Sequence, residues 1–554
     1  MKFLKMNGRA VPSFLVEMGK KVGASEMDRR EFLATASSFG ATTAAAYGML
    51  GLAAPAAKAD GHAKAGGTVR IEMEVRALKE PRTYDWSQIA NFTRGWLEYL
   101  VSYENDGTFK PQLLESWEIS EDAKTYTLNV REGVKWNNGD DLTAEQIAAV
   151  IEGWCDKDVE GNSMAGRMAT LIDANTNKAI AGAIEVVDAT TIKLNLPAPD
   201  ISLVAGMADY PAAITHPSFT AETMLTNPIG TGPYLPDSHE VGVKGVLVRN
   251  EGHTWWNEGN GAWMDRVEYV DYGTESAAWL AAAEADEIDM TYNVSGEFVD
   301  LIAASSELES NEIVTAATIV VRPNQLAEVG GVKPYADKRV RQALAMAVDN
   351  SVLLELGING QGTIGENHHV CPVHPEYTQL PERKVDPAAA KALMDEAGMG
   401  DFEHELISID DDWRRNTTDA VADQLRQAGI NVKRTILPGS TFWNDWAKYP
   451  YSSTNWNHRP LSVQVHALAY RSGEAWNEFG WENAEFDELL TEALATADLD
   501  ARKGIVAKMA ALIQDEGVTI QPYWRSLYNH TRTGLEGGAM HISFEIRPAQ
   551  LHWT

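Results

Sequence analysis

The chain has 554 residues, of which 44% are hydrophobic and 23% are charged, proportions typical of a folded globular protein. This length is too great for one ordinary hydrophobic core, so we expect two or more lobes or domains. The chain holds 79 acidic residues against 47 Lys and Arg, and its formal net charge is −32. So acidic a surface repels phosphate backbones and anionic lipid headgroups, which argues against a nucleic-acid-binding protein.

An arginine pair precedes an apolar, Ala-rich stretch near the N-terminus. Arg29 and Arg30 are followed by a mildly apolar segment over residues 34–54, and an Ala-Lys-Ala cleavage pattern stands at 57–59. A basic region, an apolar region and a cut site in this order predict an export signal. The arginine pair favours the twin-arginine branch of export, in which a receptor reads the signal and no anchor is formed.

The export signal sets the expected start of the mature protein. We expect residues 1–59 to be removed and the mature chain to begin near Asp60. Met27 is an alternative start of translation, because residues 1–26 look like an upstream extension. A membrane helix is the less favoured interpretation, since the sequence has no run of about 20 strongly apolar residues. We therefore expect an exported, periplasmic protein.

Strand and helix patterns alternate through the rest of the chain. Residues 125–131 alternate strictly in polarity, which predicts a half-buried strand. Thr143 and Gln146 form a capping box that opens a helix reaching Trp154. Further elements are predicted as a strand at 192–196, a helix from the Asp-Pro pair at 386–387 to Gly398, a helix at 418–428 and a strand at 430–437. This alternation favours mixed α/β lobes.

Two extended runs, residues 315–324 and 519–529, have the character of strands that cross between lobes. If the chain crosses to a second lobe and returns, the two crossings make a hinge about which the lobes close on a ligand. The alternative is two ordinary strands of one sheet.

The chain has two cysteines, Cys155 and Cys371. An oxidising compartment permits a disulfide between them. Two buried free thiols are the alternative, because sequence alone does not bring the two side chains together.

Six motifs in chain order carry a family resemblance. The most specific is Asn-Pro-Ile-Gly-Thr-Gly-Pro-Tyr at 227–234, whose glycines and proline also read as a tight bend above Tyr234. The others are residues 113–122, 126–136, 139–145, 248–256 and 337–344. Together they resemble the extracytoplasmic solute-binding proteins of ABC importers, in the peptide, oligosaccharide and nickel class called family 5. The resemblance spans residues 66–530.

The resemblance implies an α/β, two-lobe periplasmic-binding-protein fold of type II, or cluster C, with a two-strand hinge. Lobe I is expected over residues 60–320 plus 521–554, with an extra subdomain at about 95–225, and lobe II over 321–520. The implied function is to capture a peptide-like solute between the lobes and deliver it to an ABC permease in the inner membrane. We expect a monomer with no cofactor and no enzymatic activity. An oligosaccharide or another carboxylate-bearing solute is the alternative.

Aromatic and polar side chains gather in one loop-rich stretch and form the candidate ligand site. Aromatic faces stack on apolar or sugar-ring surfaces, while amide and guanidinium groups fix orientation. The candidate residues are Trp443, Trp446, Asn455, Trp456, Asn457, Arg459, Arg471, Trp476 and Asn477.

This chain departs from the family pattern in one segment. In the family, the segment matching residues 455–460 lies near the cleft, and peptide binders commonly place there an Asp that takes the α-ammonium group. This chain has no carboxylate in that segment. Arg459 or Arg471 could instead hold a carboxylate in a two-pronged hydrogen-bonded fork. The alternative is that Arg459 pairs with an acidic residue of the protein.

Two further function classes remain open. His368, His369, Cys371 and His374 lie within seven residues and offer ligands that suit nickel, copper or zinc, although their spacing fits no standard zinc pattern. Because the family includes nickel and haem binders, a metal or haem carrier is an alternative. A secreted hydrolase is disfavoured, since the sequence has no Gly-x-Ser-x-Gly or His-Glu-x-x-His motif. The acidic pair at 411–412 reads as a solvated face.

Overall fold

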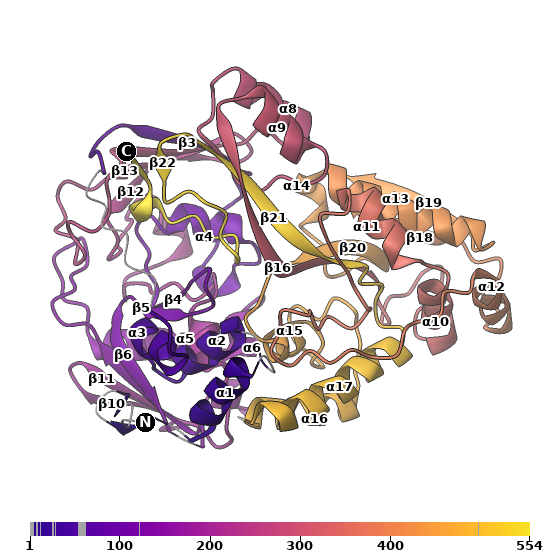
Figure 1. The fold of residues 1–554 in the computed structure, drawn as a ribbon, viewed down its shortest axis with the longest axis horizontal. Helices are drawn as coiled ribbons and strands as arrows, with labels where there is room; N and C mark the ends of the chain where they lie inside the picture. The colour runs from indigo at the N-terminus through magenta and orange to yellow at the C-terminus, as the bar shows by residue number, and fades with distance from the viewer. Residues whose placement is uncertain are drawn as a thin grey trace.

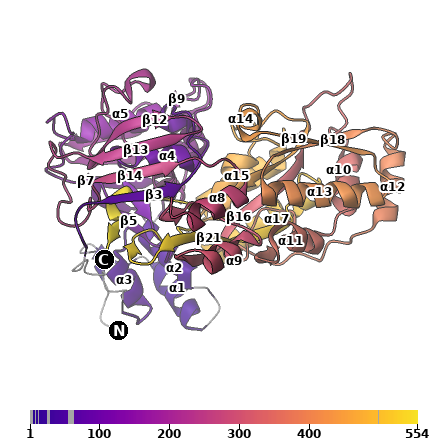
Figure 2. The ribbon, with the colours of Figure 1, turned by 90° about the horizontal axis from the view of Figure 1, so that it is seen from above.

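The computed structural model describes residues 5–6, 9–11, 13–24, 27, 29–53, 63–120, 122–496 and 498–554. Figures 1 and 2 show two lobes side by side, with a pair of long strands running between them. The lobes are mixed α/β, as the alternation of strand and helix patterns predicts.

One continuous sheet passes through both lobes. Its strand order is β12-β13-β14-β3-β15-β21-β16-β20-β18-β19, and β17 pairs with β21. The first lobe contributes β3 (Thr68–Glu72), β12 (Tyr234–Glu240), β13 (Lys244–Arg249), β14 (Arg266–Val270) and β15 (Met290–Thr291). The second lobe contributes β17 (Gly362–Ile364), β18 (His404–Ile409), β19 (Val432–Leu437) and β20 (Tyr451–Trp456).

The two long strands between the lobes are β16 (Leu308–Pro323) and β21 (Tyr523–Arg532). They pair antiparallel from Leu308 opposite Arg532 to Thr318 opposite Trp524, with a register shift between Val314 and Ala317. The extended runs expected at 315–324 and 519–529 therefore belong to one antiparallel pair that links the lobes (Figure 1).

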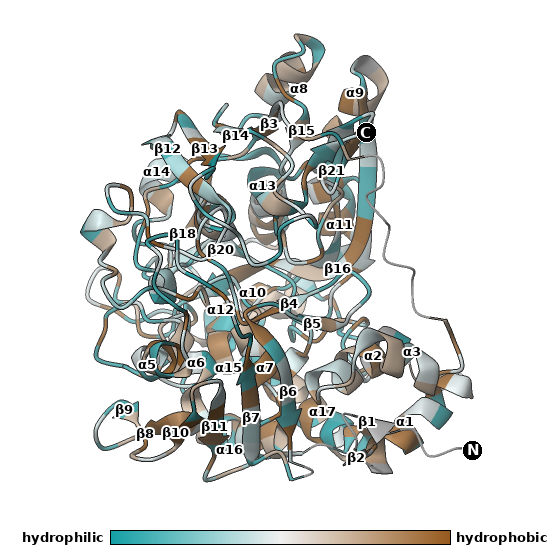
Figure 3. Cartoon of the chain, turned by 90° about the vertical axis from the view of Figure 1, so that its left-hand side faces the viewer, coloured by the Kyte–Doolittle hydropathy of each residue, from teal (hydrophilic) through white to brown (hydrophobic). Residues whose placement is uncertain are grey.

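A second, smaller sheet belongs to the first lobe. Its order is β10-β11-β7-β6, from β6 (Leu114–Ile119), β7 (Thr125–Val130), β10 (Ile184–Asp188) and β11 (Thr191–Asn195). Apolar stretches of β7 and β11 stand out in the hydropathy colouring of Figure 3. Helix α5 (Ala144–Trp154) begins at the predicted capping box of Thr143 and Gln146. The predicted strands and this helix are confirmed.

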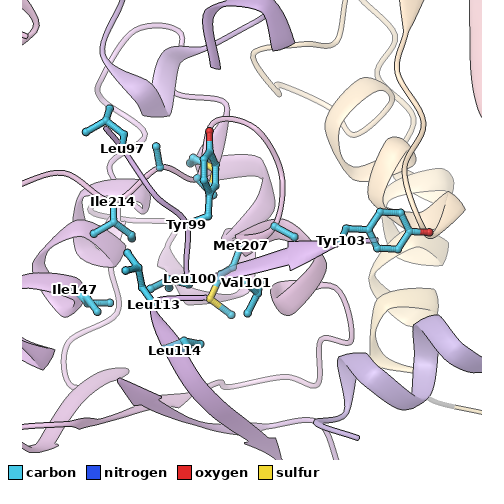
Figure 4. Packing of buried hydrophobic residues seen from close by; sticks show 14 of the residues in the cluster. Leu97, Tyr99, Leu100, Val101, Tyr103, Leu113, Leu114, Ile147, Met207 and Ile214 are labelled. Atoms are coloured by element: carbon cyan, nitrogen blue, oxygen red, sulfur yellow. The ribbon is translucent and has the colours of Figure 1, made fainter. Parts of the chain in front are cut away.

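The core of the first lobe is built from side chains of several elements. Figure 4 shows Leu100, Leu113, Ile147 and Met207 converging, all buried. Tyr103, at the end of strand β4 (Val101–Tyr103), lies apart from this group and near the second lobe. Strand β4 therefore contributes side chains to the first-lobe core and also one residue that lies near the second lobe.

Helices cover the sheet of the second lobe. They are α10 (Lys338–Met346), α11 (Asn350–Ile358), α12 (Pro387–Glu396), α13 (Asp412–Gln427), α15 (Ser462–Ala469), α16 (Ala484–Ala495) and α17 (Leu499–Asp515). The helix expected from 386 to Gly398 is confirmed as α12. The helix expected at 418–428 begins six residues earlier, because Asp411 caps it by accepting a hydrogen bond from the backbone N–H of Arg414.

The expectation that the acidic pair at 411–412 forms a solvated face is wrong for Asp411. Its side chain is buried, caps α13 and pairs with the Arg414 guanidinium, Nη2 to Oδ2 3.0 Å. A capping carboxylate satisfies backbone N–H groups that a helix start leaves free.

The tight bend at 227–234 packs against the first lobe as expected. A Cβ atom on Gly230 would lie 1.9 Å from the carbonyl oxygen of Trp96, so only glycine fits there. Tyr234 is fully buried, and its hydroxyl donates to the carbonyl of Met264 at 3.1 Å. This motif therefore shapes the lobe and does not line the space between the lobes.

Cys155 and Cys371 are free thiols, and both are buried. Burial raises the pKa of the Cys155 thiol to about 12. Of the two alternatives for the cysteines, the structure therefore has separate thiols, with no disulfide between these two described residues.

The expected export segment folds as α2 (Arg29–Ser38) and α3 (Thr43–Met49). Phe32 and Leu33 are fully buried, and the hydroxyl of Ser37 accepts a hydrogen bond from the backbone N–H of Phe109 at 2.8 Å. The cleavage pattern at 57–59 and the expected mature start at 60 lie outside the described residues. Within the described part of the chain, no helix has both the length and the apolar character needed to cross a membrane.

Candidate functional site

The second-lobe wall of the site follows strand β20. This strand pairs with β16 from Thr318 opposite Trp456 to Pro323 opposite Tyr451, so the central sheet holds its backbone. The chain then leaves the sheet over residues 457–460 and enters α15. The candidate residues at 455–459 therefore lie where a rigid strand meets a loop, facing the first lobe.

A buried carboxylate fixes the aromatic side chain at the end of β20. Glu478 is fully buried and accepts hydrogen bonds from Trp456 Nε1 at 2.8 Å and from the Thr454 hydroxyl at 2.6 Å. The Arg322 guanidinium balances its charge, Nε to Oε2 2.8 Å. Trp456 is thus held in one orientation by a charge pair that is itself out of solvent.

The first-lobe wall comes from three separate segments. Asp85 and Trp86 stand just before helix α4 (Ser87–Thr93), and Tyr103 ends β4. Asp209 and Tyr210 follow the short helix α7 (Leu203–Met207). These five residues face the second lobe from positions far apart in the sequence.

Two small cavities lie between the walls. One is lined by Tyr103, Asp209, Tyr210, His458, Arg459 and their neighbours, and the other by Asp85, Trp86, Tyr210, Trp446, Asn455, Trp456, Asn457, Arg459 and Trp476. Each has a free volume of only about 20 Å³. Tyr210 and Arg459 line both cavities and so form the partition between them. The lobes are closed on each other in this structure.

Arg459 makes an ion pair across the cleft. Its Nε lies 3.0 Å from Oδ2 of Asp209, and its guanidinium carbon lies 5.5 Å from the centre of the Tyr210 ring. Arg167 also pairs with Asp209, Nε to Oδ2 2.9 Å. Burial favours the neutral form of Asp209, but the two guanidinium groups outweigh it and the pKa of Asp209 is lowered. One carboxylate therefore forms ion pairs with two buried guanidinium groups.

Aromatic rings from both lobes enclose the second cavity. Trp456 and Trp476 meet edge to face at 5.7 Å, and Trp476 stacks on Tyr210 at 6.2 Å. Trp86 and Trp446 meet at 6.1 Å on the other side. We call this space, with Asp85 at its margin, the aromatic cavity.

The structure brings together six of the nine candidate ligand residues. Trp446, Asn455, Trp456, Asn457, Arg459 and Trp476 line the aromatic cavity. Trp443 lies behind it, with its ring 3.9 Å from that of Trp86. Arg471 and Asn477 do not line either cavity, because the Asn477 amide donates to the backbone carbonyl of Arg471 and supports a turn.

The sequence analysis missed every first-lobe residue of the site. Asp85, Trp86, Tyr103, Asp209 and Tyr210 belong to no motif, and nothing local distinguishes them from the other acidic and aromatic residues. These residues come together because three loops of the first lobe end beside one another in the folded protein.

The residues weighed as metal ligands have separate structural partners. His374 accepts from the backbone N–H of Cys371 at Nδ1, and its Nε2–H therefore donates to the carbonyl of Arg459 at 3.1 Å. His369 meets the hydroxyl of Tyr470 at 3.1 Å, and His368 lies 3.3 Å from Glu366. Among the described residues no group of three or more His, Cys, Asp or Glu is arranged to hold a metal ion. This segment supports the backbone of Arg459.

Larger hollows exist elsewhere, but one lobe alone lines each of them. Cavities of about 270 Å³ and 340 Å³ lie in the first lobe, the former beside Trp255 and Trp256. Closure of two lobes responds only to contacts that both lobes make. We therefore place the candidate site at the smaller cavities between the lobes.

Comparisons with known proteins agree with this architecture. A model of the bacterial extracellular solute-binding proteins, family 5, matches residues 108–478. The chain is 25% identical to a probable peptide ABC transporter periplasmic-binding protein of Sinorhizobium fredii, over 87% of this chain and 93% of that one. It is 22% identical to the dipeptide-binding protein DppE of Bacillus subtilis, over 85% and 89%.

Solved structures share the two-lobe fold. The binding protein AgaA of A. tumefaciens, in complex with agropinic acid, superposes with a TM-score of 0.77 at 20% identity, covering 88% of this chain and 99% of that one. The oligopeptide-binding protein AppA of Bacillus subtilis, in complex with a nonapeptide, gives 0.77 at 18% identity, covering 89% and 100%. Since the family model covers more than half of the sequence, this chain belongs to the bacterial extracellular solute-binding proteins, family 5.

Proposed function

We propose that this protein is the extracytoplasmic solute-binding component of an ABC importer, and that it captures a peptide-like solute bearing a free carboxylate. The observation that carries the proposal is the closed cleft, in which Arg459 of one lobe meets Asp209 of the other. The names of the relatives in Sinorhizobium and Bacillus support a peptide-like solute. We assign to this cleft the binding of a solute without catalysis.

Arg459 is the residue we assign to the solute carboxylate. Its guanidinium lies between the two cavities, and its backbone is held by His374. A guanidinium group matches a carboxylate with two parallel hydrogen bonds. In the closed protein Asp209 takes that place, so a solute carboxylate would enter by replacing a contact that already closes the lobes.

Solute contacts made by both lobes would supply the energy of closure. A ligand shifts an equilibrium only by its differential affinity for the two states. First-lobe residues Trp86 and Tyr210 and second-lobe residues Trp456 and Arg459 line the same space, so a solute bound there touches both lobes only when they are closed.

We also propose that the protein works in the periplasm as a monomer and hands its solute to a permease in the inner membrane. The arginine pair at 29–30 and the apolar stretch after it support twin-arginine export and removal of residues 1–59. We assign residues 60–320 with 521–554 to lobe I, the extra subdomain to about 95–225, and residues 321–520 to lobe II.

The test is a thermal unfolding screen of the purified protein against a library of peptides, sugars and organic acids. A solute present at a hundred times its Kd stabilises the folded state by about 2.7 kcal/mol, which raises the unfolding midpoint. Native mass spectrometry of protein purified gently from its own compartment identifies retained cargo. A library that leaves the midpoint unchanged throughout, with no cargo retained, contradicts the proposed function.

A further inference from the structure

We propose that an N-terminal segment of this chain is a latch that holds the two lobes in their closed arrangement until the segment is removed. The latch consists of residues 29–49, which contain α2 and α3. The inference concerns the chain before processing, and it rests on the proposed function only for the removal of residues 1–59. It gives the segment a conformational role in addition to export.

Hydrogen bonds seat the latch on the first lobe. The backbone N–H of Phe109, at the start of β5 (Phe109–Pro111), donates to the Ser37 hydroxyl at 2.8 Å. Trp117 Nε1, from β6, donates to the backbone carbonyl of Ser38 at 2.9 Å. All four residues are buried, so water does not compete for these two hydrogen bonds.

Gly40, which follows α2, sets how closely the latch approaches the first lobe. Its φ is +87°, and a Cβ atom there would lie 2.4 Å from the backbone carbonyl oxygen of Trp117. Any other residue would therefore have to displace the latch from the strand. Farther along, the Tyr47 hydroxyl of α3 donates to Asp106 Oδ2 at 3.1 Å. The first lobe thus holds the latch along its length.

The second lobe completes the seat. A void of only about 10 Å³ remains where the latch meets both lobes, and Figure 1 shows α2 at this boundary, between β6 and α15. The void is lined by Ala34 and Phe39 of the latch, by Ile201 and Ala205 of the first lobe, and by Pro460 and Leu461 of the second. Phe39, Ile201 and Leu461 also belong to one buried apolar cluster. The latch therefore packs against a surface that neither lobe provides alone.

The seat shares two chain segments with the cleft. Pro460 directly follows Arg459, and Ala205 lies four residues before Asp209. Pro460 and Ala205 line the cavity of Arg459 and Asp209 as well as the void beside the latch. A movement that parts Arg459 from Asp209 therefore also parts two walls of the seat.

The latch acts as a ligand that is built into the chain. A group that binds only the closed arrangement shifts the equilibrium toward that arrangement. Attachment to the same chain gives the latch a high effective concentration at its seat. Parting the walls of the seat would bring water to a face of α2 whose residues 32–38 are all buried. The lobes should therefore open more readily once the segment has been removed.

Hydrogen exchange of the full chain, read by mass spectrometry, tests the inference without any solute. The Phe109 amide reports whether the latch is seated, because it donates to Ser37. The Ser276 amide, at the start of α8 (Ser276–Glu284), reports whether the lobes are closed, because it donates to Asp412 Oδ2 of the second lobe at 3.1 Å. In Figure 1, α8 and α2 lie at opposite ends of the boundary between the lobes, so the two amides report separately.

Two glycine variants form a matched pair. Gly40→Ala introduces the clash with Trp117, whereas Gly51→Ala has a similar backbone strain, with φ +71°, but open space around the new Cβ atom. Gly40→Ala should speed exchange at both Phe109 and Ser276 by about tenfold or more. Gly51→Ala should change either rate by less than about twofold.

A second pair makes the comparison independent of glycine. Leu33 is fully buried, whereas Leu52 is 43% exposed. Leu33→Asp should therefore release the latch and speed exchange at both amides, and Leu52→Asp should not. Unfolding midpoints check that all four variants keep the folded lobes.

The possible outcomes have distinct meanings. Faster exchange at both amides in Gly40→Ala and Leu33→Asp, and in neither control, supports the inference. Faster exchange at Phe109 alone shows that the latch is seated without holding the lobes, which overturns the inference. Equal exchange at Phe109 in all four variants and the unchanged chain also overturns it, because the segment is then not seated there. None of these outcomes involves a solute, so the importer function is judged separately by the unfolding screen.

Discussion

Arg459 and Asp209 approach from opposite lobes, with Nε 3.0 Å from Oδ2, and Asp209 also holds Arg167. Two buried guanidinium groups thus share one carboxylate. Because Arg459 shares its carboxylate partner with Arg167, we expect an anionic group of the solute to bind at Arg459.

Replacing Arg459 tests its role in solute binding. Arg459→Gln should weaken binding of a carboxylate-bearing solute by about 2–3 kcal/mol, since a charge-assisted hydrogen bond is lost. Titration calorimetry measures the change. Arg471→Gln is the matched control, because Arg471 lines neither cavity, and its affinity should match that of the unchanged protein. Equal loss in both variants would contradict the assignment.

Replacing Asp209 tests the balance of charge across the cleft. Asp209→Asn leaves Arg167 and Arg459 buried with no carboxylate between them, which should cost about 3–5 kcal/mol of stability in the absence of solute. A bound solute carboxylate would restore the missing charge, so the solute should raise the unfolding midpoint more in this variant than in the unchanged protein. Thermal unfolding with and without solute measures both. A smaller shift in the variant would be evidence that the solute carboxylate lies elsewhere.

The buried ion pair of Glu478 and Arg322 behind Trp456 also stabilises the fold. Glu478→Gln should destabilise the fold by about 3–5 kcal/mol, because Arg322 is then buried without its partner. Denaturant unfolding measures the loss. Glu492→Gln, at an exposed position of α16, should change the free energy of unfolding by less than about 0.5 kcal/mol. If the two variants unfold alike, Glu478 does not hold the second-lobe wall.

Buried imidazoles make stability depend on pH. Desolvation lowers the pKa of His374 and of His466 to about 3, against an ordinary value near 6.5. The unfolded chain therefore binds protons that the folded protein excludes, and stability falls as the pH drops below about 6.5. Each such histidine contributes a slope of about 1.4 kcal/mol per pH unit between its unfolded and folded pKa values.

The variant His466→Gln isolates this effect. Its free energy of unfolding should fall less steeply between pH 6.5 and pH 4.5 than that of the unchanged protein, as measured by denaturant unfolding at each pH. Glu72 acts in the opposite sense, because burial raises its pKa to about 8 and its protonated form favours the folded state at low pH. The quantity to measure is therefore the difference in slope between the variant and the unchanged protein, because Glu72 contributes to the slope of both. Identical slopes would show that His466 is protonated in the folded protein.

Local signals predicted the secondary structure where side chains act on their own backbone. The capping box of Thr143 and the Asp-Pro start at 386 were correct, because a cap is decided by residues within one turn. The start of α13 was missed because Asp411 was read by its charge and not as a cap. The motif at 227–234 was correctly read as a bend, since only glycine tolerates the approach of Trp96.

The candidate site was predicted for one wall only. The second-lobe residues at 455–459 follow one strand, and a family resemblance pointed to them. The first-lobe residues Asp85, Trp86 and Asp209 sit on loops that come together only when the lobe is folded. Arg471 and Asn477 were included because they are near in sequence, yet neither residue lines the two cavities.

The sequence by itself determined the mixed α/β class, the local elements and the family, because these depend on short-range patterns and ordered motifs. Only the tertiary structure decided that Asp209 is the partner of Arg459, that His374 supports its backbone, and that five aromatic residues line one cavity together with Asp85. Those relationships join segments distant along the chain, and their geometry is set by how two lobes meet across a shared pair of strands.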